Sequence, residues 1–193
     1  MKVKALSPAL GAEVIGIDLS LPLDDVMIDD LRAIWLEYQM IVIRDQELTP
    51  QKQLAFAKAL GEPDIYPFLR GLDGFPMITE VLKKEDEKVN FGGVWHSDTT
   101  YQECPPMATL LYAKELPPLG GDTLFANQYA AFANLSAPLR NILEKLRAIN
   151  AAGKKRVTST RSERLKESAS GVNPDDLAGI HPVVRTHPET GRK

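Results

Sequence analysis

The sequence predicts a mixed α and β fold, and three observations support this prediction. Apolar residues recur at helical spacing over 27–38 and again over 135–146. Short apolar runs of strand length, such as 40–43, lie between these stretches. His96 and Asp98 stand two positions apart, which places both side chains on one face of a strand. At 193 residues, one domain over 1–193 is the default.

The N-terminal elements follow from local patterns. Residues 12–19 alternate apolar with polar or glycine positions and predict a strand. A helix is expected to begin at Asp24 and Asp25, because acidic residues in a first turn suit the helix dipole, and apolar residues from Met27 to Tyr38 form one face of it. The β-branched run 40–43 predicts a buried strand.

A second helix has clear signals at both of its ends. Thr49 is a favourable N-cap, and Pro50 suits the first helical position. The helix should run to Leu60, with Gly61 ending it.

The rest of the chain alternates loops, strands and helices. Strands are expected at 77–82, around His96, and at 107–113, and helices at 127–135 and 136–149. Residues 154–171 are basic and rich in serine and threonine, which predicts a mobile loop or lid over the site.

His96 and Asp98 are the main candidates for chemistry. A His and an Asp that converge from one strand supply two ligands of the 2-His-1-carboxylate triad, which leaves coordination positions open on Fe(II). Gly92 and Gly93 precede them, and glycines allow a sharp bend or a close approach of backbone to a ligand. A hydrogen-bonded His beside a solvated Asp is the structural alternative.

Several blocks of sequence together resemble one known family. They are Trp95-His96-Ser97-Asp98, Pro105-Pro106, Leu110–Pro117 and Gly120–Phe125, flanked by Gly11–Leu19, Ile41–Gln46 and His181–Gly191. In order and spacing these blocks resemble the taurine/2,4-dichlorophenoxyacetate dioxygenase (TauD/TfdA-like) family, from about Pro8 to Lys193.

The resemblance implies a fold, an activity and roles for three residues. The fold is a double-stranded β-helix (a jelly roll, cupin-like) with flanking helices. The activity is that of an Fe(II)- and 2-oxoglutarate-dependent dioxygenase, which decarboxylates 2-oxoglutarate to succinate and CO2 and hydroxylates a small anionic organic substrate. His96 and Asp98 match the iron ligands, and Thr123 matches the threonine that helps hold 2-oxoglutarate.

The third iron ligand of the family, a distal histidine, has no match in this sequence. Of the three histidines, His181 and His187 both precede prolines in what resembles a late hairpin, which favours a structural role over ligation. About six candidate strands also fall short of the eight of a jelly roll. We therefore expect a domain that is truncated before the distal histidine, with weak iron binding and negligible turnover.

The substrate is only partly constrained. In taurine-hydroxylating members of the family, a histidine and a tyrosine of the loop before 77–82 contact the sulfonate. Here Ile65–Arg70 contains no histidine, which argues against taurine itself. Arg70 is a candidate for an anionic substrate, although an exposed arginine is more often only solvated.

Composition excludes some partners and locations. A net charge of −3 gives no electrostatic reason to expect nucleic acid. No apolar run is long enough for a signal peptide or a membrane span, so we expect a cytoplasmic location and no membrane partner. The expected partners are the substrate and dioxygen, and self-association into a homo-oligomer is left open.

Two other functions remain open at this point. One is a metal-dependent hydrolase with zinc on a cupin-like barrel, for which Glu103 is the nearby candidate base. The other is a non-catalytic binding protein with a vestigial His-x-Asp motif.

Overall fold

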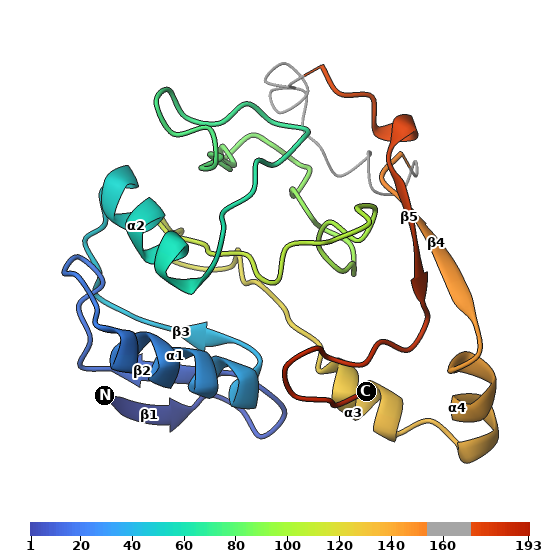
Figure 1. Ribbon diagram of the computed structural model, residues 1–193. Helices are drawn as coiled ribbons and strands as arrows, with labels where there is room; N and C mark the ends of the chain where they lie inside the picture. The colour runs from blue at the N-terminus through green and yellow to red at the C-terminus, as the bar shows by residue number, and fades with distance from the viewer. Residues whose placement is uncertain (154–170) are drawn as a thin grey trace. The chain divides into compact units, whose positions relative to one another are not determined.

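The computed structural model describes residues 1–153 and 171–193, which belong to two compact units. The first unit consists of Met1–Glu62, Leu110–Leu143 and Val184–Lys193, and the second of Pro63–Thr109 and Glu144–Val183 (Figure 1). The predicted lid at 154–171 lies, except for its last residue, outside the described residues. In the described part of the chain, no helix has the length and apolar character needed to cross a bilayer.

The first unit contains a three-stranded sheet in the order β1-β2-β3. Strand β1 (Lys2–Ala5) pairs antiparallel with β2 (Ala12–Ile15), and β2 pairs in parallel with the short β3 (Ile41–Val42). The predicted strand over 12–19 is confirmed only as far as Ile15, because Gly16 turns into the left-handed region at φ 84° and ends the ladder. Strand β1 was not predicted.

Helix α1 (Asp25–Tyr38) connects β2 to β3, as a parallel pair requires. The Asp24 carboxylate accepts a hydrogen bond from the Met27 backbone N–H at 2.8 Å, and Gln39 ends the helix at φ 67°. Helix α2 (Pro50–Leu60) begins after its N-cap Thr49 and ends at Gly61. Both predicted helices are confirmed, and so is the N-cap Thr49, whereas Asp24 caps α1 and Asp25 is its first residue.

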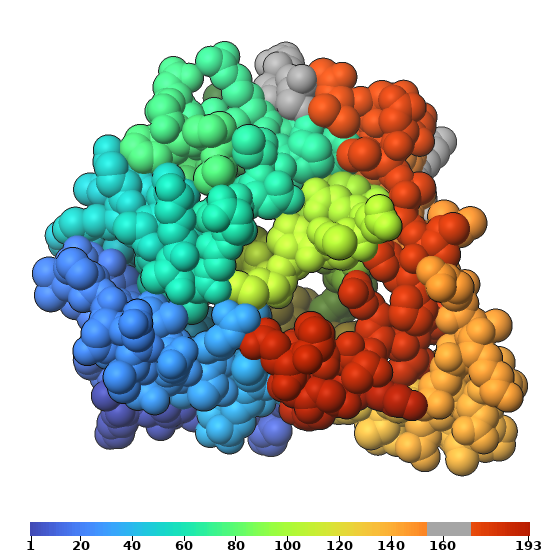
Figure 2. Space-filling model, viewed as in Figure 1, coloured from blue at the N-terminus to red at the C-terminus, as the bar shows by residue number. Residues whose placement is uncertain are grey.

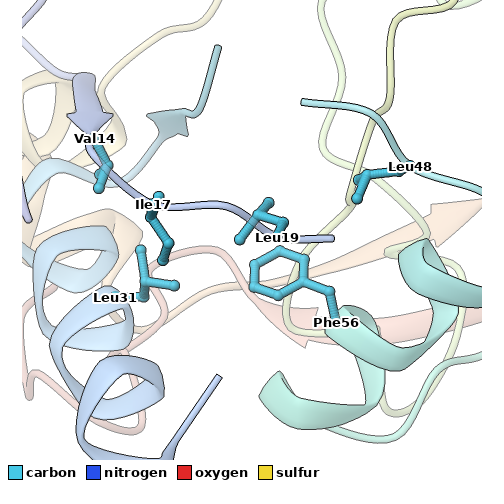
Figure 3. Close-up of a cluster of buried hydrophobic side chains, with 6 residues drawn as sticks. All are labelled: Val14, Ile17, Leu19, Leu31, Leu48 and Phe56. Atoms are coloured by element: carbon cyan, nitrogen blue, oxygen red, sulfur yellow. The ribbon is translucent and has the colours of Figure 1, made fainter. Parts of the chain in front are cut away.

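The hydrophobic core of the first unit lies between these helices and the chain that follows β2. Figure 3 shows the side chain of Leu31 on α1 pointing toward Ile17, and the ring of Phe56 on α2 beside Leu19. The buried cluster consists of Val14, Ile17, Leu19, Leu31, Leu48 and Phe56. The apolar faces of the two helices are therefore used for packing, as periodicity predicts.

The C-terminal segment packs within the first unit. Arg32 of α1 donates to the carboxylate of Glu189 at 2.7 Å, and the guanidinium of Arg192 lies 3.8 Å from the ring centroid of Tyr129. Tyr129 belongs to α3 (Gln128–Ala133). Figure 2 shows this dark-red segment beside the blue atoms of the N-terminal part of the unit.

The predicted helix over 136–149 is wrong in its second half. Helix α4 is limited to Ala137–Leu143, and the chain then forms strand β4 (Arg147–Ala151). Strand β4 belongs to the second unit, where it pairs antiparallel with β5 (Ala178–Pro182), five residues on each side. This ladder overrides the weak helical pattern because it supplies the backbone hydrogen bonds from a distant segment.

The strands predicted between residues 77 and 113 are also wrong. Residues 77–82, the segment around His96 and residues 107–113 are not strands, and no strand pairing is found for them among the described residues. A strand needs a neighbour that completes its hydrogen bonds, and side chains such as Leu111 are largely exposed. A short 3₁₀ helix, η1 (Pro174–Asp176), precedes β5.

Candidate metal centre

The backbone that carries His96 and Asp98 is irregular, which corrects the strand predicted for it. Gly92, at φ 68°, and Thr99, at φ 50°, both adopt the left-handed region and enclose the motif between two turns. A strand cannot pass through either conformation. The glycine before the motif was recognised as a bend, whereas a β-branched residue at positive φ is rare and has no sequence signal.

The two side chains nevertheless converge. His96 Nε2 lies 3.0 Å from Asp98 Oδ1, and both side chains are partly open to solvent. Two ligand atoms held at about 2.1 Å from one ion and at right angles to each other would be about 3.0 Å apart. The observed separation therefore suits two neighbouring ligands of one metal ion.

The imidazole of His96 is fixed by the backbone. Its Nδ1 lies 2.6 Å from the carbonyl oxygen of Val94, which can only accept, so Nδ1 carries the proton of this hydrogen bond. Metal-binding histidines are typically oriented in this way, with the second nitrogen left for the ion. The Cβ that any larger residue would add at Gly92 would lie 3.3 Å from His96 Cε1, so glycine leaves room for the ring.

These hydrogen bonds provide a test of whether a cation fits the site. A neutral imidazole with its proton on Nδ1 presents a lone pair at Nε2, and Asp98 Oδ1 is also an acceptor. A metal ion between the two atoms would suit their 3.0 Å separation, as would a proton on Nε2 that makes a hydrogen-bonded ion pair. The donor set, imidazole and carboxylate, fits Fe(II).

Thr109 is a third member of this group that sequence analysis missed. Its hydroxyl donates to Asp98 Oδ2 at 2.8 Å, so the two oxygens of Asp98 have different partners. The sequence offers no signal for this contact, because the two residues are eleven positions apart and no predicted strand pairing joins them.

Thr123, the residue matched to 2-oxoglutarate binding, lies in the first unit. It is exposed and follows two consecutive glycines, Gly120 and Gly121, at φ 76° and 74°. Because His96 and Asp98 belong to the second unit, the role of Thr123 stays a prediction.

The two late histidines have other partners. His181 on β5 is buried, with Nε2 at 2.9 Å from the carbonyl oxygen of Gln102. His187 Nδ1 accepts from the backbone N–H of Glu189 and of Thr190. The predicted turn after His187 is present, but β5 pairs with β4 and not with a strand that starts at Arg192.

The two other charged candidates, Arg70 and Glu103, lie at the surface. Arg70 forms an exposed ion pair with Asp73 at 3.1 Å, and Glu103 is exposed. Within the described residues, no cluster of three or more His, Cys, Asp or Glu side chains is placed to hold a metal ion. The structure therefore brings together two of the three expected ligands.

Aromatic rings gather in the same unit. Tyr66 packs edge-on against Phe68 and Phe91, with ring centroids 5.6 and 6.4 Å apart, and Phe68 lies 5.3 Å from Tyr101. Phe91 directly precedes Gly92, on which the His96 ring lies. Along the chain, the motif is thus preceded by the exposed ring of Phe91, whereas Phe68 is buried.

A family model matches nearly the whole sequence. Residues 2–193 match the model described as "Taurine catabolism dioxygenase TauD, TfdA family". The chain is 33% identical to an alpha-ketoglutarate-dependent sulfate ester dioxygenase of Pseudomonas putida, over 100% of the chain and 64% of that protein.

Solved structures agree with this match. A taurine dioxygenase from Burkholderia xenovorans is 34% identical, with a TM-score of 0.76 over 99% of the chain and 61% of that structure. AAD-2, crystallised with Mn(II) and N-oxalylglycine, is 25% identical, with a TM-score of 0.74 over 99% of the chain and 70% of that structure. The chain thus spans less than two thirds of the length of the first two of these relatives.

Proposed function

Because the chain belongs to the TauD/TfdA family, we propose that it carries part of the active site of an Fe(II)- and 2-oxoglutarate-dependent dioxygenase that hydroxylates a small anionic organic substrate. The observation that carries the proposal is the convergence of His96 Nε2 and Asp98 Oδ1 at 3.0 Å. Because the Val94 carbonyl already holds Nδ1, Nε2 is the nitrogen left for an ion.

The roles of the chain's own residues follow from their chemistry. His96 offers a neutral nitrogen, and Asp98 offers a negative oxygen that offsets part of the charge of a divalent ion. Thr123 is proposed to hold the distal carboxylate of 2-oxoglutarate. When bound, the iron and 2-oxoglutarate supply the oxidative chemistry that consumes dioxygen, and the protein supplies orientation.

We further propose that the fold is a double-stranded β-helix, as in the family. The similarity to a taurine dioxygenase over 99% of the chain supports this. The domain proposed over 1–193 takes its third iron ligand from outside this sequence. Within the described residues, no group of three or more His, Cys, Asp or Glu side chains is placed to hold a metal ion, which supports that assignment.

Phe91 and the sulfate ester relative both bear on the substrate. The exposed ring of Phe91, directly before Gly92, favours a substrate with an apolar body, and a sulfate ester, the substrate class named for the Pseudomonas putida relative, carries a negative charge. We propose an anionic organic molecule larger and more apolar than taurine. The cytoplasmic location stays a prediction.

Anaerobic titration with Fe(II) tests the proposal. The wild-type chain should bind Fe(II) weakly but measurably, and His96→Ala should weaken binding at least tenfold, because it removes one of two ligands. Wild-type binding no tighter than that of His96→Ala would reject iron ligation and favour a vestigial binding protein.

Oxygen uptake and succinate formation provide the second measurement. We expect negligible turnover by the 193-residue chain with 2-oxoglutarate. Robust turnover would contradict the missing third ligand and return His181 or His187 to the candidate ligands. Hydrolysis of a substrate with zinc, without oxygen uptake, would instead favour the hydrolase with Glu103 as its base.

A further inference from the structure

The Asp98 carboxylate has two oxygens with two different neighbours. Oδ1 faces His96 Nε2 at 3.0 Å, and Oδ2 accepts from the Thr109 hydroxyl at 2.8 Å. Thr109, His96 and Asp98 all belong to the second unit, so the two contacts can be compared directly. The Thr109 hydroxyl thus binds the oxygen that does not face the candidate metal position.

An unrestrained carboxylate on an exposed loop would not keep this arrangement. The terminal torsion of Asp is broad and nearly two-fold, so rotation exchanges the two oxygens at little cost. The Asp98 side chain is 57% exposed, which leaves packing little part in fixing it. A single directional donor on Oδ2 is therefore the feature of this site that distinguishes one oxygen from the other.

This distinction matters for a metal with open positions. A carboxylate that binds through one oxygen occupies one coordination position, whereas one that binds through both occupies two and leaves fewer for cosubstrate. Hydrogen bonds from outer residues to ligating carboxylates typically change metal affinity 10- to 100-fold.

We propose that Thr109 is a positioning residue that holds Asp98 so that Oδ1 alone faces the metal. The inference rests on the proposed function, because it takes His96 and Asp98 as the ligands. The Thr109 hydroxyl stays on Oδ2 and does not contact the metal.

Titration of the wild-type 193-residue chain with Mn(II) alone, followed by electron paramagnetic resonance of the free ion, tests the proposal. Thr109→Val keeps the shape and removes the hydroxyl, and it should raise the Kd at least tenfold. Thr109→Ser keeps the hydroxyl and should stay within about threefold of wild type. Thr79→Val, the same change elsewhere in the second unit, serves as the matched control and should leave the Kd unchanged.

A second measurement reads the binding mode itself. In the infrared difference spectrum on Mn(II) binding, the antisymmetric and symmetric carboxylate bands lie further apart for one-oxygen than for two-oxygen ligation. Wild type and Thr109→Ser should show the wide separation, and Thr109→Val a narrower one. If Thr109→Val does not fold, as judged by circular dichroism, Thr109→Ala replaces it with the same expectations.

The outcomes distinguish a failure of the role of Thr109 from a failure of the proposed function. A Kd for Thr109→Val within twofold of wild type, with binding abolished by His96→Ala, would overturn the role of Thr109 and leave the proposed function intact. An unchanged band separation in Thr109→Val would overturn the positioning role in the same way. Wild-type binding no tighter than that of His96→Ala would overturn both.

Discussion

The two units of the chain are stabilised in different ways. The first unit holds all four α-helices of the described residues and the buried cluster around Leu31 and Phe56. In the described part of the second unit, the buried apolar side chains are limited to Phe68, Leu69 and Ala152. There, the candidate ligands lie on irregular backbone; His96 is oriented by a hydrogen bond to the Val94 carbonyl, and Asp98 by one from the Thr109 hydroxyl.

The contrast shows how scaffold and site are divided in this sequence. Periodic apolar residues form a rigid element, but its side chains are used in packing and are therefore not available for chemistry. A ligand pair with partly exposed side chains keeps its donor atoms available, but it needs specific hydrogen bonds to hold one orientation.

The largest expected effect is on the core of the first unit. Leu31 is 1% exposed, so Leu31→Ala should lower the free energy of unfolding by about 3 kcal/mol through lost burial and a residual cavity. Leu111→Ala, at a side chain that is 73% exposed, is the matched control and should change it by less than about 0.5 kcal/mol. Urea unfolding followed by circular dichroism measures both, and equal effects would contradict a core centred on Leu31.

A smaller effect is expected where the backbone turns after Asp98. Thr99 has φ 50°, a conformation that costs a β-branched residue about 1 kcal/mol or more and that glycine adopts freely. Thr99→Gly should therefore be neutral or raise the melting temperature slightly, because relief of strain offsets the extra freedom of the unfolded chain.

The neighbouring residue provides the control. Thr100 is not among the residues with positive φ, so Thr100→Gly should destabilise by about 0.5–1 kcal/mol. Equal losses in Thr99→Gly and Thr100→Gly would show that the left-handed turn does not strain the chain.

Helices α1 and α2 could be predicted from the sequence almost to the residue. Their signals are local: the acidic residues Asp24 and Asp25, the cap at Thr49, the proline at the start of α2, and an apolar face at helical spacing. Strand β4 could not be predicted, because its ladder partner β5 is some thirty residues away and overrides a helical pattern.

The site was predicted in part, and for a reason that proved wrong. The spacing of His96 and Asp98 suggested convergence on one face of a strand, but a turn at Thr99 and not a strand accompanies it. The side chains of His96 and Asp98 still converge, because contacts with Val94 and Thr109 orient them. Such contacts depend on where an irregular backbone goes, which no local pattern encodes.

The smallest effect concerns the ion pair of the first unit, and it depends on pH. The hydrogen bond from Arg32 holds the pKa of Glu189 below its ordinary value, with smaller contributions from the charges of Arg32 and His187. A lowered pKa in the folded state means that the contribution is fully present above the unfolded value, near 4.5, and is lost as the pH falls through the folded pKa.

Glu189→Gln should therefore lower the free energy of unfolding at pH 7 by about 0.5 kcal/mol, as is typical of a partly exposed pair. The difference from wild type should shrink as the pH falls below about 4.5. Asp73→Asn, in the more exposed Arg70–Asp73 pair of the second unit, should have no measurable effect at pH 7. Thermal unfolding across this pH range measures both variants, and a Glu189→Gln deficit that persists in acid would mean that packing, and not charge, holds the C-terminal segment against α1.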